Sequence, residues 1–246
     1  MHFFDADLIT IRARLAEMGG LAEEQLARAL EAVASRDARL AQDVVARDAE
    51  IDRREMALEE LSIRTLALRH PVARDLRETI AALKIASTIE RIGDLAKSVA
   101  RRAIGLSGAE RQRTEASILR MGALAQAQLS EVLDAYAMRD AVAALAVWRR
   151  DVEIDELYNS LFRELVSEMS QQPRLVSTGA QLMFIAKNIE RIGDHSTFIA
   201  EMTYFVVNGE ALSDDRPKGD PMFPLIDLET DVEAAPLPGA SRGRRV

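Results

Sequence analysis

Mostly apolar positions recur every three or four residues along much of the chain, with polar residues between them. A step of three or four places side chains on one face of an α-helix. One series is Ile51, Arg54, Leu58, Leu61, Thr65 and Leu68, and another is Ile85, Ile89, Ile92, Ala96 and Val99. This periodicity predicts long helices, each with one buried face.

Capping residues and prolines divide the pattern into six helices. Asp5 or Asp7 can cap a first helix that runs to about residue 35, Asp37 can cap a second, and Pro71 ends the second. The third runs from just after Pro71 to residues 105–108, the fourth ends near 137, the fifth spans 140 to about 172, and the sixth spans 173 to about 208. Long helices joined by short turns pack antiparallel, and 30 residues make a rod about 45 Å long.

The two halves of the chain repeat one another. Residues 89–94 read Ile-Glu-Arg-Ile-Gly-Asp and recur identically at residues 189–194. Other landmarks return after 102 or 103 residues, which indicates duplication of a unit of about 100 residues. We therefore predict an all-α fold of two tandem, pseudo-symmetric three-helix bundles. Repeat one covers residues 1–107, repeat two covers 108–209, and a flexible tail that holds five of the seven prolines covers 210–246.

Composition narrows the class of protein. The 246 residues include no cysteine, which excludes disulfides, thiolate nucleophiles and cysteine-ligated metals. The formal charge of −8 repels phosphate backbones, so we expect no nucleic-acid partner. The N-terminus lacks the features of a signal peptide and no window approaches 18 apolar residues. We expect a cytoplasmic protein that reaches a membrane only through its partners.

Pairs of acidic residues are the candidate functional groups. Glu90 and Asp94 lie four apart on one helical face, and Asp48 and Asp52 do the same on the preceding helix. Since neighbouring helices run antiparallel, all four carboxylates can converge along one groove. Repeat two offers the matching set Asp151, Asp155, Glu190 and Asp194. Carboxylate clusters without cysteine suit divalent or iron-type ions, with Fe, Zn, Mn, Mg or Ca as candidates.

A plainer interpretation is that these acids pair with nearby bases on a solvated face. The candidate bases are Arg53, Arg54, Arg91 and Lys97.

Glycine inside a helix costs about 1 kcal/mol relative to alanine, so Gly93 and Gly193 call for an explanation. Either a bound ion beside the acids or the close approach of a partner helix would provide one.

The remaining chemical groups give weaker signals. His195 follows Asp194 and is interpreted as a surface histidine, with a nitrogen ligand or a phosphoacceptor as the alternatives. His70 precedes proline in a turn, where we expect it to face solvent. Glu190-x-x-x-Asp194 differs from the Glu-x-x-His spacing of di-iron bundles, so an oxidase loses support. No glycine-rich phosphate loop is present, and phosphate binding by the chain itself is not indicated.

Over about residues 1–209 the sequence resembles the PhoU family of phosphate-signalling regulators. The resemblance rests on the doubled Glu-Arg-Ile-Gly-Asp sequence, on Met-Gly-Gly-Leu-Ala-Glu at residues 18–23, and on Arg-His-Pro-Val-Ala-Arg-Asp-Leu-Arg at residues 69–77. It also rests on residues 190–201, which read like the family's Glu-Arg-Ile-Gly-Asp-His…Ile-Ala-Glu. These motifs occur in order inside a duplicated helical chain, which makes the resemblance specific.

The resemblance implies that the acidic pairs bind metal clusters and that the protein is a homodimer. It further implies a negative regulator of phosphate uptake and of the phosphate-starvation response, which bridges the ATPase subunit of the phosphate ABC transporter and a sensor histidine kinase. The sequence departs from the pattern at Phe198, and Glu201 replaces the Arg101 of repeat one, so the second groove is expected to be more acidic.

Three functions are compatible with these observations. The first is a non-enzymatic adaptor that holds transporter and kinase in a signalling-off arrangement. The second is a carboxylate-metal hydrolase or oxidase, which would need an open coordination position and a substrate cavity. The third is a phosphotransfer bundle that uses His195.

Overall fold

The computed structural model describes residues 3–212, and all regular structure in this range is helical, which confirms the all-α class. Residues 213–246, and with them nearly all of the predicted tail, lie outside the described residues. The helices are α1 (Phe3–Ser35), α2 (Ala38–Arg47), α3 (Ala49–Arg69), α4 (Ala73–Leu106), α5 (Glu115–Met138), α6 (Ala141–Arg150), α7 (Val152–Gln171), the 3₁₀ turn η1 (Pro173–Leu175) and α8 (Val176–Asn208).

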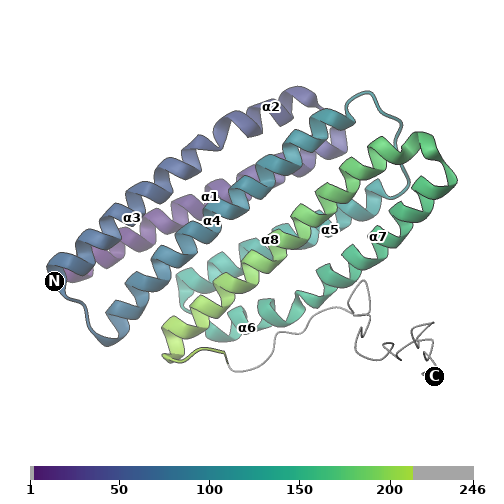
Figure 1. Cartoon of the computed structure of the whole chain (residues 1–246). Coiled ribbons are helices and arrows are strands. Elements are labelled where there is room, and N and C mark those ends of the chain that lie inside the picture. The colour runs from purple at the N-terminus through teal and green to yellow at the C-terminus, as the bar shows by residue number, and fades with distance from the viewer. Residues whose placement is uncertain (1–2, 213–246) are drawn as a thin grey trace, which may run out of the picture.

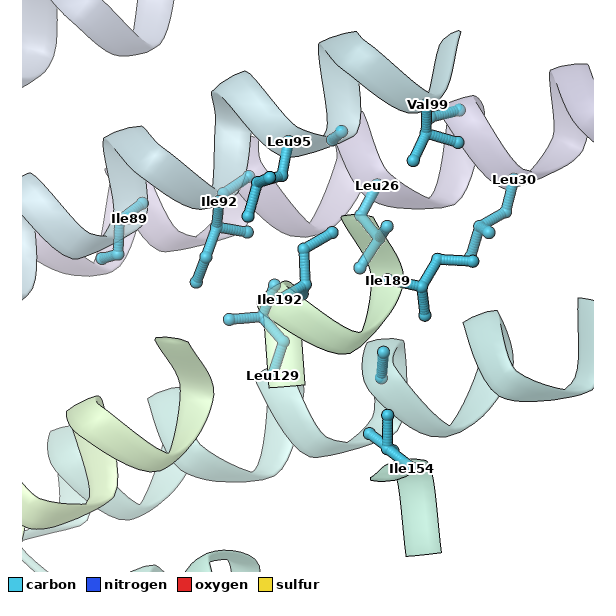
Figure 2. Packing of buried hydrophobic residues seen from close by; sticks show 14 of the residues in the cluster. Leu26, Leu30, Ile89, Ile92, Leu95, Val99, Leu129, Ile154, Ile189 and Ile192 are labelled. Atoms are coloured by element: carbon cyan, nitrogen blue, oxygen red, sulfur yellow. The ribbon is translucent and has the colours of Figure 1, made fainter. Parts of the chain in front are cut away.

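Two three-helix bundles stand side by side, as predicted (Figure 1). The first contains α1, the α2–α3 pair and α4, and the second contains α5, the α6–α7 pair and α8. Helices α4 and α8 run antiparallel in the middle and make the most extensive contact between elements. Figure 2 shows Ile89 and Ile92 of α4 packed in the same cluster as Ile189 and Ile192 of α8. The repeats therefore share one hydrophobic core.

Two of the predicted helix starts are set by aspartate caps. The Asp37 carboxylate accepts hydrogen bonds from the amides of Arg39 and Leu40 at 2.8 and 3.0 Å. The same arrangement begins α6, where the Asp140 carboxylate caps two amides at 2.9 Å. Satisfying the free amides of a first turn in this way stabilises a helix by about 1 kcal/mol.

The predicted caps at Asp5 and Asp7 are wrong. Helix α1 already begins at Phe3, because no residue between Phe3 and Asp7 interrupts a helix. Asp7 instead accepts a hydrogen bond from Arg69 Nε at 3.0 Å. Its carboxylate thus ties the start of α1 to the end of α3.

The helices predicted over residues 37–70 and 140–172 are each interrupted once. The interruptions fall at Asp48 and Asp151, whose side chains are buried. At both positions the backbone tightens to an i,i+3 hydrogen bond, from Ile51 N to Asp48 O and from Ile154 N to Asp151 O, each 2.9 Å long. Hydrophobic periodicity continues through both breaks, which is why it predicted one uninterrupted helix in each repeat.

Buried ion pairs join the two repeats at both ends. Arg36 and Arg139 each follow the first helix of a repeat in the left-handed conformation, with φ of 60° and 55°. Arg36 pairs with the buried Glu115 of repeat two at 2.5 Å. Arg139 and Arg12 both pair with the buried Glu78 of repeat one. Each repeat therefore sends an arginine to a buried carboxylate of the other.

Across residues 3–212, no helix has both the length and the apolar character needed to span a bilayer.

We expect Glu78→Gln to destabilise the fold by about 3 kcal/mol at pH 7. This value is near the lower limit for breaking a buried ion pair, because the side chains of Arg12 and Arg139 are 37% and 27% exposed and reach water. Burial raises the pKa of Glu78, but the hydrogen bonds from Arg12 and Arg139 outweigh it and leave the pKa below its ordinary value. The contribution of Glu78 is therefore complete above the ordinary carboxyl pKa and disappears as the pH falls through the lowered one.

Urea unfolding of both proteins at a series of pH values measures this effect. The stability difference should be constant around pH 7 and shrink in acid. Glu59→Gln, at an exposed position of α3, is the control and should change stability by less than about 0.5 kcal/mol. A Glu78→Gln variant as stable as the control at pH 7 would contradict the assignment.

Candidate functional site

In repeat one, a lysine joins the acidic groups of two helices. Asp48 lies at the α2–α3 junction, and its carboxylate accepts a hydrogen bond from Gln25 Nε2 at 2.8 Å. Lys97 Nζ donates to Asp48 Oδ2 and, at 2.9 Å, to Asp94 Oδ1. The interpretation that the acids pair with nearby bases is therefore correct for Asp48 and Asp94.

The other two predicted acids of repeat one lie in the same groove. Asp52 and Glu90 are both half-buried. Burial raises the pKa of Glu90, and the charges of Asp94, Glu55, Asp52 and Asp48 raise it further, in that order. The four predicted carboxylates therefore do share one neighbourhood between α4 and the α2–α3 pair. Glu55 joins them, although the sequence pattern did not single it out.

Repeat two forms the matching groove with a lysine at a different position. Asp151 is buried, and its carboxylate accepts a hydrogen bond from Gln128 Nε2 at 2.9 Å. Thr197 occupies the position of Lys97, and its hydroxyl donates to the main-chain oxygen of Asp194 at 2.7 Å. Lys187 lies one turn before Glu190 on α8 and pairs with it at 2.7 Å. A threonine therefore occupies the position from which Lys97 joins two aspartates in repeat one.

The electrostatics of Glu190 reflect this arrangement. Burial raises the pKa of Glu190, the Lys187 ammonium opposes the rise, and the charges of Asp194 and Asp155 add to it. Asp194 and Asp155 thus act on Glu190, and the Asp151 carboxylate lies beside Gly193 of the same helix, where its Oδ1 would be 2.8 Å from an added Cβ. In neither groove, among the described residues, do three carboxylate or imidazole groups come close enough to form a ligand set for one ion. Metal binding by these eight residues stays a prediction.

The glycines of the doubled hexapeptide allow a close helix approach. A Cβ on Gly93 would lie 2.9 Å from Ile51 Cδ1, and a Cβ on Gly193 would lie 2.8 Å from Asp151 Oδ1 and 3.2 Å from Ile154 Cδ1. Real Cβ atoms essentially never show contacts shorter than 3.0 Å, so the nearest neighbour would have to shift in each case. Of the two explanations open at the sequence level, the structure supports the approach of the partner helix, which carries the buried aspartate itself.

Two glutamines that hold these aspartates were missed from the sequence. Gln25 of α1 and Gln128 of α5 are buried, and Gln25 Nε2 also donates to the main-chain oxygen of Gly93 at 3.1 Å. Their separation of 103 residues equals that of Asp48 and Asp151, so the repeat alignment contained the signal.

The two histidines considered earlier lie in different surroundings. His70 caps the end of α3 and is exposed, as predicted. His195 is half-buried rather than on an open surface, because α8 packs against α4 at this level. Burial lowers the pKa of His195, and the charges of Arg191 and Arg91 lower it further. The phosphoacceptor role stays an untested alternative for His195.

Comparison with known proteins gives consistent matches. The family model described as "PhoU domain" matches residues 15–103 and 118–203, one match in each helical unit. The chain is 46% identical to the phosphate-specific transport system accessory protein PhoU homolog of Caulobacter vibrioides, covering 88% of this chain and 95% of that protein. It is 44% identical to the homolog of the same name from Rhizobium meliloti, covering 89% and 93%.

Solved structures agree with these sequence matches. The crystal structure of PhoU from Pseudomonas aeruginosa superposes with a TM-score of 0.82 at 39% identity, covering 84% of this chain and all of that one. The phosphate transport system regulatory protein PhoU from Streptococcus pneumoniae gives a TM-score of 0.80 at 28% identity, covering 85% and 99%.

Alanine substitutions at three helical glycines should separate packing from helix propensity. Gly20→Ala, with nothing within 4 Å of the new methyl group, should stabilise the fold by about 0.5–1 kcal/mol. Gly193→Ala should destabilise it by about 1–3 kcal/mol, because the Asp151 carboxylate is buried and held by Gln128. Gly93→Ala should fall between them, since it meets the end of a flexible isoleucine side chain.

Thermal and urea unfolding of the three variants would measure this order. A Gly193→Ala protein as stable as Gly20→Ala would show that the close contact between α8 and the α6–α7 junction imposes no constraint.

Proposed function

Because this chain belongs to the PhoU family, with relatives aligned over more than nine-tenths of their length, we propose that it regulates phosphate transport and acts negatively on the phosphate-starvation response. The observation that carries the proposal is the similarity, through both helical units, to proteins named accessory or regulatory proteins of phosphate transport systems. These names favour a regulator over a carboxylate-metal hydrolase or oxidase.

The proposed mode of action is that of a non-catalytic cytoplasmic adaptor. The protein, as a homodimer, would contact the ATPase subunit of the phosphate ABC transporter and a sensor histidine kinase. It can shift the kinase between signalling states only by the difference in its affinity for those states. The formal charge of −8 favours docking to basic patches on both partners.

The ion pairs at both ends of the molecule support the use of this fold as a rigid spacer. Glu78 and Glu115 each receive an arginine from the other repeat, and the isoleucines of α4 and α8 fill the space between them. A partner bound to one repeat would therefore be held at a fixed position relative to a partner bound to the other.

Metal binding is the second part of the proposal, and the two grooves fit it differently. In repeat one, the Lys97 ammonium already lies between Asp48 and Asp94 and supplies the positive charge. In repeat two the same position holds the neutral Thr197, and Lys187 pairs with Glu190, so we assign a divalent cation such as Mn²⁺, Fe²⁺, Zn²⁺ or Mg²⁺ to the groove formed by Asp151, Asp155, Glu190 and Asp194. When bound, such an ion would neutralise the carboxylates and fix the spacing of α8 and the α6–α7 pair.

Titration of the metal-free protein with Mn²⁺ tests this difference between the repeats. We expect wild-type binding to be lost in Asp155→Asn/Glu190→Gln and kept in Asp52→Asn/Glu90→Gln, the matched change in repeat one. Lys97→Met should lower the melting temperature by leaving the buried Asp48 charge unpaired, and added Mn²⁺ should restore part of the loss. Equal effects of the two double variants would contradict the assignment to repeat two.

The regulatory role is tested in the host organism. Deletion of the gene should leave phosphate-starvation genes expressed at high phosphate, and a plasmid copy of the wild type should restore repression. The purified protein should bind the purified transporter ATPase subunit and the kinase's cytoplasmic domain.

Starvation genes that stay repressed at high phosphate in the deletion strain would overturn the regulatory proposal. Phosphoesterase activity or oxygen uptake that disappears in Glu90→Ala would instead support an enzyme.

A further inference from the structure

A polar cavity of about 460 Å³ opens between α4 and α8, at the level of the doubled hexapeptide. Arg91 comes from the first copy of the hexapeptide and Arg191 from the second, at the same position of each. Arg101, about three turns after Arg91 on α4, lines the same cavity. The antiparallel packing of α4 and α8 thus brings three guanidiniums from two repeats to one hollow.

These three guanidiniums have no ion pair or hydrogen bond with another group in the described range, residues 3–212. The cavity also contains a lysine and a carboxylate, Lys97 and Asp94, which already bind one another at 2.9 Å. Lys97 is further engaged by Asp48. The positive charge available to a ligand is therefore that of the three arginines, in a protein whose net charge is −8.

The hydrogen-bonding groups of the cavity favour an oxyanion. A guanidinium presents its N–H donors in a planar fork that matches the oxygens of phosphate. His195 of α8 also lines the cavity, where repeat one has Leu95 at the matching position. Its imidazole ring carries an N–H in either protonation state and can donate it to an oxyanion.

We propose that this cavity binds a phosphate-class dianion between Arg91, Arg101 and Arg191. Repulsion from the acidic protein as a whole disfavours long polyanions, whereas a small oxyanion meets only the local positive field. The ligand is either free inorganic phosphate or the terminal phosphate of a larger molecule such as a nucleotide. Because it contacts α4 and α8 together, its binding would favour the arrangement in which the two repeats face one another as they do here. The proposal does not depend on the regulatory role or on metal binding.

Isothermal titration calorimetry of the full chain tests the site with two probes, inorganic phosphate and ATP. The buffer contains a chelator and has low ionic strength. Removing one charge-assisted fork should weaken binding about tenfold, so Arg91→Gln/Arg191→Gln should lose it to the limit of detection. Arg91→Lys/Arg191→Lys keeps the charge without the fork and should bind with intermediate affinity. Binding should also weaken as salt is raised.

Arg64→Gln/Arg120→Gln is the matched control, because it removes the same charge from exposed positions on α3 and α5 and should bind like the wild type. Both altered arginines of the test variant are exposed, so circular dichroism should show an unchanged helix content. Binding of phosphate, or of ATP alone, that disappears only in the cavity variant supports the proposal and identifies the source of the phosphate group. The proposal is overturned if neither probe binds, or if Arg91→Gln/Arg191→Gln binds as well as the Arg64→Gln/Arg120→Gln control. Either result favours an acidic partner segment on these arginines.

Discussion

The antiparallel contact between α4 and α8 is the constraint on which the rest of the structure depends. Isoleucines from both helices fill it, so that two repeats that would each expose an apolar face become one core. The same contact brings Arg91 to Arg191 on one side. Each of the two helices also packs against the broken helix pair of its own repeat, where the acidic grooves lie. A change in this contact would alter the cavity and both grooves together.

Buried charge is the second constraint, and the two repeats meet it differently. Asp48 and Asp151 are buried at the interruption of a helix, and each is held by a glutamine from the first helix of its repeat. A buried carboxylate needs such hydrogen bonds and a countercharge to avoid a large desolvation cost. In repeat one Lys97 provides the countercharge, whereas repeat two has Thr197 there. The two grooves thus place their lysine differently: Lys97 joins Asp48 and Asp94 in repeat one, whereas Lys187 pairs with Glu190 in repeat two.

The candidate site could be predicted in outline but not in its contacts. The i,i+4 spacing of Glu90 and Asp94 and its repetition in the second unit placed the acids on the correct faces. The spacing did not reveal the helix break at Asp48, because apolar periodicity continues through it. Gln25 and Gln128 were missed because a buried amide has no periodic signature, and only their shared displacement of 103 residues indicated them. Of the three cavity arginines, only Arg91 was considered as a partner for the acids, although none of the three has such a partner among the described residues.

The sequence by itself determined the helices apart from the breaks at Asp48 and Asp151, the caps at Asp37 and Asp140, the duplication and the family. Each of these depends on residues that are close together in the chain or on direct comparison of its two halves. The tertiary structure alone decided which base meets which acid. Lys97 reaches Asp48 across 49 residues, and Arg139 reaches Glu78 across 61. Such pairs depend on which helices become neighbours and on their relative rotation, since a helical face presents many charged side chains and local spacing does not choose among them.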